Sequence, residues 1–285
     1  MKATATRPAA ASAPAVGVAE LVVADRTLAI EFGWTGTDDP AAPLVVFLHE
    51  GLGSLAMWKD YPQSLCAAAG TRGLVYSRPG YGRSTPRAPG EKWSVDFMHR
   101  QAQEVLPALL AHCGIVRPPW LLGHSDGASI ALLHAAAFPE RVAGVIAVAP
   151  HIFVEDVSIR SIEAARTVYR TTDLPARLAR YHADPDSAFW GWNDIWLDTA
   201  FRTWNIEDRL PLIRCPVLAV QGADDEYGTM AQIDDLARHV PQAQLVKLVR
   251  CGHSPHRDQP AALNGAVAAF MRRHRAAPLT TAGVA

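Results

Sequence analysis

The chain contains the stretch Leu121-Leu122-Gly123-His124-Ser125-Asp126-Gly127, from which its fold can be worked out. An apolar run at residues 120–122 ends here in a Gly-x-Ser-x-Gly turn, and residues 128–138 then have the composition of a helix. A sharp turn from a strand into a helix leaves no room for side chains beside its central residue, which explains the two glycines. Such a turn lifts the serine hydroxyl clear of the backbone. The five-residue pattern also arises by chance, so its meaning depends on a base, an acid and an oxyanion site elsewhere in the chain.

The composition limits the partners and the location of the protein. The chain has 285 residues, of which 49% are hydrophobic, enough for one large α/β domain or for a core domain with an inserted subdomain. Its net charge of −1, without a basic stripe, argues against nucleic-acid and membrane partners, and we expect a small-molecule substrate. Its four cysteines form no Cys-x-x-Cys pair, so we expect reduced thiols and a cytoplasmic location. Whether the chain forms a homo-oligomer is left open.

Apolar runs that alternate with helical stretches predict the fold class. Residues 18–24 and 27–34 are β-rich and indicate an antiparallel pair near the N-terminus. The runs that have the character of buried strands lie at residues 44–48, 74–77, 120–122, 142–148, 216–220 and 245–249. Helical stretches between them favour an α/β fold with a mostly parallel central sheet flanked by helices. We assign residues 18–150 and 211–275 to this core.

The segments outside the core differ in composition. Residues 1–17 are rich in Ala, Pro and Thr and are expected to be a disordered tail, and residues 276–285 a loose one. In residues 151–210 the alternation stops, and we expect a helical cap inserted into the core. Four of the eight tryptophans of the chain lie in this insert, and Trp190 and Trp192 are candidates for substrate contact. The competing interpretation is that these tryptophans form a small core of the insert itself.

Polar residues follow the predicted strands at their carboxyl ends, which is where open parallel sheets bind ligands. Among them, Ser125, Asp225 and His253 each follow a separate strand, in the chain order serine, aspartate, histidine. This order, together with the turn at the serine, resembles the α/β-hydrolase superfamily. The resemblance implies that Ser125 is the nucleophile, His253 the base, and Asp225 the acid that orients it.

Four further motifs carry the same resemblance, which extends over about residues 18–275. Residues 48–54 (Leu-His-Glu-Gly-Leu-Gly-Ser) are similar to the oxyanion loop of the family, and residues 77–84 to its Asp-x-x-Gly-x-Gly-x-Ser segment. Residues 222–225 resemble the acid turn, and residues 251–253 the Gly-His base turn. By motif position, the oxyanion hole is formed by the backbone N–H groups of Gly51 and Asp126, with Leu52 one residue away from the first position.

The chain departs from the family pattern at two residues of this site. Glu50 stands where a glycine usually follows the histidine, and Asp126 where Met or Gln usually follows the nucleophile. A carboxylate aimed into the oxyanion hole would oppose catalysis. We therefore expect the Asp126 side chain to point away and to find a partner such as an arginine.

Other assignments are open for several of these residues. Asp224 competes with Asp225 as the acid, and Glu155 or Asp156 could also reach the histidine. Glu50 and His151 could contact substrate or water, or could merely hold loops together. His49 is expected to be structural. His253 and His256 form a His-x-x-His pair without a third ligand, so we expect no metal and no cofactor.

The sequence therefore predicts a serine hydrolase that cleaves small, largely apolar carboxylic esters through an acyl-enzyme. The alternatives are hydrolysis of a C–C bond or a lactone, and aminopeptidase action on N-terminal proline, for which Glu50 or Glu155 could bind the amine. Outside enzymes, the alternative is a non-catalytic binding protein with the same fold.

Overall fold

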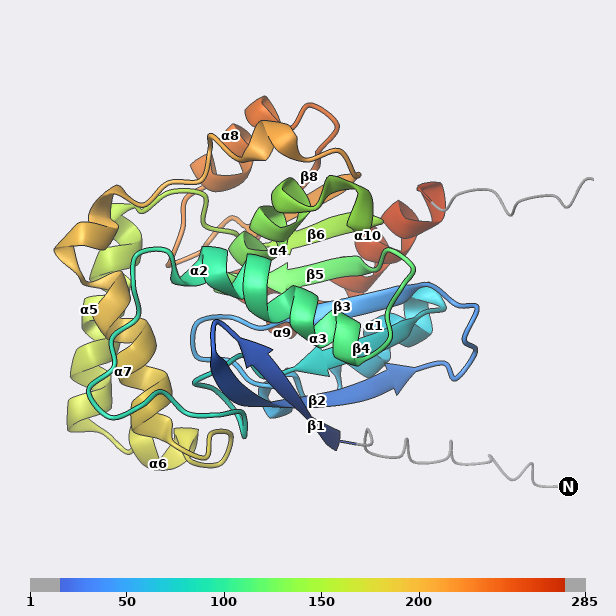
Figure 1. The fold of residues 1–285 in the computed structure, drawn as a ribbon. Helices are drawn as coiled ribbons and strands as arrows, with labels where there is room; N and C mark the ends of the chain where they lie inside the picture. Colours follow the sequence, from blue (N-terminus) through green and yellow to red (C-terminus); the bar gives the residue numbers. More distant parts are fainter. Residues whose placement is uncertain (1–15, 275–285) are drawn as a thin grey trace, which may run out of the picture.

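The structure is a computed structural model and describes residues 16–274. Its centre is an eight-stranded sheet with the order β1-β2-β4-β3-β5-β6-β7-β8 (Figure 1). The strands are β1 (Val16–Val23), β2 (Arg26–Gly36), β3 (Leu44–Leu48), β4 (Arg72–Tyr76), β5 (Trp120–His124), β6 (Gly144–Val148), β7 (Val217–Gly222) and β8 (Gln244–Leu248). β2 is antiparallel to both β1 and β4, and all other neighbours are parallel. The predicted mostly parallel sheet is thus confirmed.

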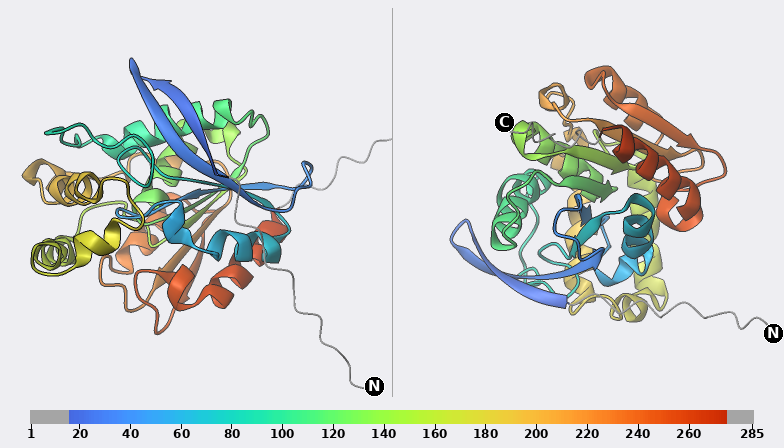
Figure 2. Two further views of the ribbon diagram at one scale, coloured as in Figure 1. Left: turned by 90° about the horizontal axis from the view of Figure 1, so that it is seen from below. Right: turned by 90° about the vertical axis from the view of Figure 1, so that its right-hand side faces the viewer.

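Helices cover both faces of the sheet, which is why its central strands are apolar throughout (Figure 2). Every residue of β5 and β6 is buried. One face packs against α1 (Tyr61–Ala69) and α10 (Pro260–Arg273), and the short α9 (Pro255–Asp258) precedes α10. The other face packs against α2 (Phe97–Arg100), α3 (Leu106–His112), α4 (Asp126–Ala137) and α8 (Ala231–His239).

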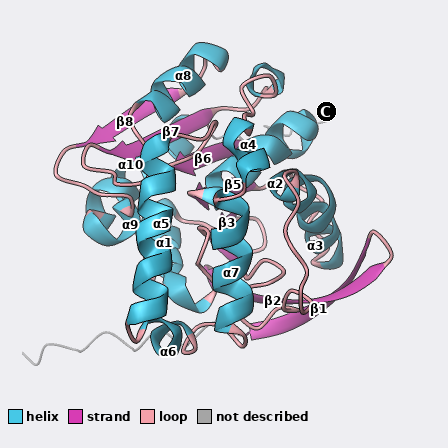
Figure 3. Cartoon of the chain, turned by 90° about the vertical axis from the view of Figure 1, so that its left-hand side faces the viewer, coloured by secondary structure: helices cyan, strands magenta, loops and turns pink. Residues whose placement is uncertain are grey.

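Residues between β6 and β7 form a group of helices beyond the carboxyl ends of the parallel strands (Figures 1 and 3). These are α5 (Asp156–Thr171), α6 (Leu174–Leu178) and α7 (Pro185–Trp196), and α5 packs against α7. We refer to α5, α6 and α7 as the inserted helices. Short 3-10 turns cover Ala56–Trp58, Pro139–Arg141, Thr199–Thr203 and Leu210–Leu212.

The structure differs from the sequence predictions at the edges of elements. Val16 and Gly17, which we expected in the N-terminal tail, belong to β1; the rest of that tail and residues 276–285 lie outside the described residues. The helical stretch between β4 and β5 is not one regular helix, because a π-helical turn, Gln101–Val105, separates α2 from α3. Pro107, two residues after this turn, lacks the N–H that a regular α-helix needs there, so the backbone hydrogen bonding of the helix widens at this point.

Two further predictions can be compared with the described part of the chain. Cys66, Cys113, Cys215 and Cys251 are all free thiols, as the sequence predicts. Within residues 16–274, no helix combines the length and the apolar character needed to cross a membrane.

Candidate active site

Ser125 occupies a strained turn between β5 and α4. Its φ of 54° and ψ of −121° lie in a region that residues with a side chain rarely adopt. The flanking glycines are required by close approach, since a Cβ on Gly123 would lie 2.1 Å from the Gly127 carbonyl oxygen. A Cβ on Gly127 would lie 2.1 Å from the carbonyl oxygen of Leu48, at the end of β3. The Gly-x-Ser-x-Gly pattern is therefore explained by packing on both sides of the serine.

His253 and Asp225 form a directly hydrogen-bonded pair in the loops after β8 and β7. His253 Nδ1 donates to Asp225, at 2.8 Å from Oδ1 and 3.0 Å from Oδ2. The carboxylate also accepts from the backbone N–H of Tyr227 at 2.8 Å and from Gln221 Nε2 at 2.9 Å. Burial works against the charge of Asp225, but these hydrogen bonds and the nearby imidazole lower its pKa. An imidazole that donates from Nδ1 keeps Nε2 free to accept a proton.

Contacts of His124 bring the loop of His253 to the end of β5. His124, which directly precedes Ser125, donates from Nε2 to the His253 carbonyl oxygen at 2.7 Å. The His253 N–H donates to Glu226 Oε2 at 3.1 Å, which holds the same loop from its other side. The three residues that the resemblance assigns to the triad therefore lie at one edge of the sheet.

The oxyanion loop predicted from residues 48–54 lies directly under α7. A Cβ on Gly51 would lie 2.2 Å from the Nε1 atom of Trp192, so only glycine fits at this position. The Glu50 carbonyl oxygen accepts three hydrogen bonds: from His49 Nδ1 at 2.7 Å, Arg78 Nη2 at 2.8 Å and the Gly53 N–H at 3.1 Å. Trp192, a predicted substrate contact, thus packs on the loop that carries the predicted oxyanion donor.

The Asp126 carboxylate is fully buried and has an arginine as its partner, as the sequence predicts. Its Oδ2 lies 3.7 Å from Arg78 Nη2, and its Oδ1 accepts a hydrogen bond from Trp196 Nε1 at 3.2 Å. Burial raises the pKa of Asp126, and the Arg78 charge opposes this shift. Trp196, at the end of α7, therefore joins the inserted helices to the turn beside Ser125.

The other predicted substrate contacts differ in their surroundings. The Glu50 carboxylate lies 3.5 Å from His124 Nδ1; burial opposes its charge, but the neighbouring histidines lower its pKa. His151 is 3% exposed, and burial lowers its pKa to about 3. Its ring packs against Trp196 and lies 5.9 Å from that of His253. Trp190 instead packs against side chains of the inserted helices, in line with the small-core interpretation.

The structure also bears on the competing assignments. The Glu155 carboxylate accepts hydrogen bonds from the side chains of Thr229 and Gln232. His49 accepts from the Arg78 N–H at Nε2 and donates from Nδ1, so it is a neutral residue that ties two loops together, as expected. His256 packs between Trp58 and His124. Within the described residues, no group of three or more His, Cys, Asp or Glu side chains is arranged to hold a metal ion.

One residue of this region, His182, was missed by the sequence analysis. It follows α6, accepts from the Gly82 N–H at Nδ1 (2.9 Å) and donates from Nε2 to the Leu52 carbonyl oxygen (3.0 Å). Burial lowers its pKa, which favours the neutral form that this geometry requires. A single histidine in a loop carries no sequence signal for such a role.

The parallel sheet, the strained serine after β5 and the aspartate–histidine pair beyond β7 and β8 define a protein of the α/β-hydrolase class. The chain belongs to the alpha/beta hydrolase family, whose family model matches residues 45–266. The known proteins to which the chain is similar include other hydrolases.

Serine hydrolase BPHL from Homo sapiens is 25% identical over 195 residues, which cover 64% of this chain and 63% of the relative. This chain thus spans about 63% of the full length of the BPHL proteins that it matches. The 2-hydroxy-6-oxononadienedioate/2-hydroxy-6-oxononatrienedioate hydrolase of Burkholderia vietnamiensis is 26% identical over 282 residues, which cover 88% of this chain and 94% of the relative. The structure of a thermophilic esterase from Thermogutta terrifontis aligns with a TM-score of 0.70 at 21% identity, over 91% of this chain and 100% of that one.

Proposed function

We propose that this hydrolase cleaves small, largely apolar carboxylic esters with Ser125 as nucleophile. The observation that carries the proposal is the hydrogen bond from His253 Nδ1 to Asp225, at 2.8 Å, beside the strained turn of Ser125. In the neutral imidazole this bond holds the proton on Nδ1, so that Nε2 can take the proton of a serine hydroxyl. No cofactor is needed for this chemistry.

The proposed reaction has two halves. Ser125 Oγ attacks the ester carbonyl as His253 Nε2 takes its proton, and the N–H groups of Gly51 and Asp126 stabilise the oxyanion. The imidazolium, stabilised by Asp225, then gives the proton to the departing alkoxide, leaving an acyl-serine and an alcohol. Water that loses a proton to His253 attacks the acyl-serine, and Ser125 regains its proton as the carboxylic acid leaves.

The surroundings of the site support an uncharged, apolar substrate. The inserted helices, which we propose act as a cap, place Trp192 against Gly51 and Trp196 beside Asp126. Aromatic side chains beside the nucleophile turn favour acyl and aryl groups. Among the described residues, Arg78 is the one arginine that pairs with Asp126. The carboxylates of Glu50 and Asp225 lie in the same region and add negative charge to it. An anionic substrate would be repelled by these carboxylates.

A second candidate is hydrolysis of a C–C bond in an anionic dienone acid. It is supported by the length match to the Burkholderia vietnamiensis hydrolase, of which this chain covers 94%. The two candidate substrates differ in charge, since the ester is neutral and the dienone acid is an anion. The carboxylates near Ser125 therefore favour the ester.

Initial rates on a panel of substrates test the proposal. We expect turnover of p-nitrophenyl acetate and butyrate well above that of a dienone acid or a prolyl anilide, and its loss in Ser125→Ala. Ester turnover equal in the wild type and in Ser125→Ala would contradict the proposal. Faster turnover of the dienone acid would favour the second candidate.

A further inference from the structure

Arg78 is a buried charge whose contacts concentrate on the oxyanion loop and the nucleophile turn. Its side chain is completely buried in the loop after β4, with the guanidinium 4.6 Å from the centre of the Tyr81 ring. Among the described residues, its Nε and Nη1 atoms have no hydrogen-bond partner, although both are buried. Burying a charge with incomplete pairing is unfavourable, and a buried ion pair is a poor source of stability. The residue therefore calls for an explanation other than stability.

The contact of Arg78 with the Glu50 carbonyl oxygen affects the next N–H. Within residues 16–274 no peptide bond is cis, so the Glu50 C=O and the Gly51 N–H belong to one planar unit and point in opposite directions. A donor that holds the carbonyl oxygen therefore also fixes the direction of the Gly51 N–H. Among the described residues, Arg78 is the one donor to this oxygen from outside the loop, with Nη2 at 2.8 Å, since His49 and Gly53 belong to the loop.

The second contact of Arg78 is with Asp126, which supplies the other proposed oxyanion donor. The same Nη2 atom lies 3.7 Å from Asp126 Oδ2, and Asp126 is the first residue of α4. The backbone N–H of Arg78 in turn donates to His49 Nε2 at 2.9 Å, which supports the second donor on the Glu50 oxygen. One side chain thus contacts Asp126 and the carbonyl oxygen of the Glu50–Gly51 peptide, whose N–H is the other donor assigned to the oxyanion hole.

We propose that Arg78 is a positioning residue that sets the oxyanion hole, by holding the Glu50–Gly51 peptide and the Asp126 side chain in fixed relation. This inference rests on the proposed function for its catalytic consequence. The competing explanation is that Arg78 only neutralises the buried Asp126 carboxylate. The two explanations differ when that carboxylate is removed.

A double-mutant cycle separates them. The variants are Arg78→Gln, Asp126→Asn and the double variant, in which no buried charge is left without a partner. Removal of one oxyanion donor lowers kcat by roughly 10²–10³-fold in other hydrolases, and a mispositioned donor is expected to lose about 10–100-fold, with KM little changed. We expect Arg78→Gln to lower kcat by this factor in the wild-type background and again in the Asp126→Asn background. Arg83→Gln, an exposed arginine of the same loop, is the matched control and should retain wild-type kcat.

A readout that does not need turnover keeps the test independent of the proposed function. In protein labelled with [15N]glycine, the Gly51 amide signal, assigned through Gly51→Ala, reports the orientation of its peptide. We expect this signal to shift or broaden in both Arg78→Gln and the double variant, and to stay unchanged in Arg83→Gln. An unchanged Gly51 signal in the Arg78 variants, or a kcat equal in Asp126→Asn and the double variant, would overturn the role of Arg78. Absence of Ser125-dependent turnover in the wild type would instead count against the proposed function, while the Gly51 signal would still decide whether Arg78 orients the peptide.

Discussion

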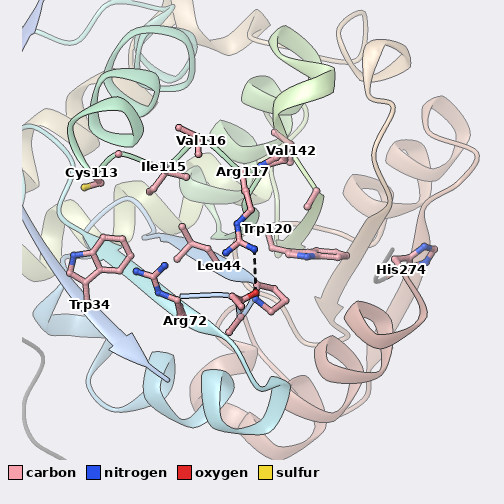
Figure 4. Close-up of a pocket in the computed structure, with 16 residues that line it drawn as sticks. Trp34, Leu44, Arg72, Cys113, Ile115, Val116, Arg117, Trp120, Val142 and His274 are labelled. Atoms are coloured by element: carbon pink, nitrogen blue, oxygen red, sulfur yellow. Dashed lines mark hydrogen bonds between the residues drawn. The ribbon is translucent and has the colours of Figure 1, made fainter. Parts of the chain in front are cut away.

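The two edges of the sheet differ in what they offer a ligand. At the amino ends of the parallel strands lies a cavity of about 650 Å³ (Figure 4). Its lining includes the starts of β3, β4 and β5, at Leu44, Arg72 and Trp120. At the carboxyl ends lies Ser125, with a strained backbone and buried ionisable groups around it.

The charged groups at the two edges are used differently. At the amino edge, Arg72 stacks on Trp34, and Arg117 donates to backbone carbonyls of the loop at Pro40 and Ala41 (Figure 4). Those contacts satisfy the arginines and hold loops in place. At the carboxyl edge, acid–base pairs converge on one turn: Asp225 with His253, Asp126 with Arg78, and Glu50 with His124. The comparison teaches that convergent ionisable groups and backbone strain, rather than cavity size, favour the carboxyl edge as the candidate site.

The largest effect is expected from removing the acid of the carboxyl edge. Asp225→Asn leaves His253 without an anionic partner and favours the wrong tautomer, so kcat should fall by roughly 10⁴-fold, as in other triads. The measurement is kcat on a p-nitrophenyl ester. Asp224→Asn, at the exposed neighbour that competes for the role, should stay near the wild type. The reverse result would assign the acid to Asp224.

A matched pair of glycine substitutions compares the edges directly. A Cβ on Gly51 would lie 2.2 Å from Trp192 Nε1, and a Cβ on Gly144, at the start of β6, would lie 2.2 Å from the Trp120 ring. Both alanine variants should lose about 1–3 kcal/mol of unfolding free energy through overpacking. Only Gly51→Ala should also lower kcat, by up to ~10²-fold, because it displaces a proposed oxyanion donor.

Urea unfolding and ester kinetics on the same samples measure the two effects. A kcat per folded molecule that falls equally in both variants would remove the distinction between the edges.

Buried neutral histidines make the carboxyl edge sensitive to acid. Burial lowers the pKa of His151 and of His256 to about 3, whereas an unfolded histidine titrates near 6.5. Between these values the unfolded state binds more protons, so stability is lost as the pH falls from about 6.5 towards 3. Each group should weaken folding by about 2 kcal/mol at pH 5 relative to pH 7.

Urea unfolding at pH 7 and pH 5 measures this loss, and His256→Gln should reduce it. A pH dependence identical in His256→Gln and the wild type would show that His256 does not titrate as its burial implies.

The smallest effect is expected at the amino edge. Arg117→Ala removes hydrogen bonds to an exposed loop and should leave kcat/KM within about twofold of the wild type, with a stability change of at most about 1 kcal/mol. Loss of ester turnover in this variant would mean that the large cavity takes part in the reaction.

The elements that obey local rules could be predicted from the sequence. Buried apolar runs marked β3 to β8, and the turn glycines with Ser125, Asp225 and His253 marked the edge at which we propose the active site. An arginine partner for Asp126 was also expected, because a carboxylate aimed into the oxyanion hole would oppose catalysis. Contacts between distant segments could not be predicted, because they depend on how the inserted helices pack. Examples are the hydrogen bond from Trp196 to Asp126 and the bridge from His182 to Leu52.

The central claim is that Ser125 is the activated nucleophile of the carboxyl edge, and covalent labelling tests it most directly. The native protein is treated with a fluorophosphonate probe, and the labelled peptide is identified by mass spectrometry. We predict one label per chain, on Ser125, that is lost in Ser125→Ala and strongly slowed in Asp225→Asn. A label on another residue, or none on the native protein, would contradict the claim.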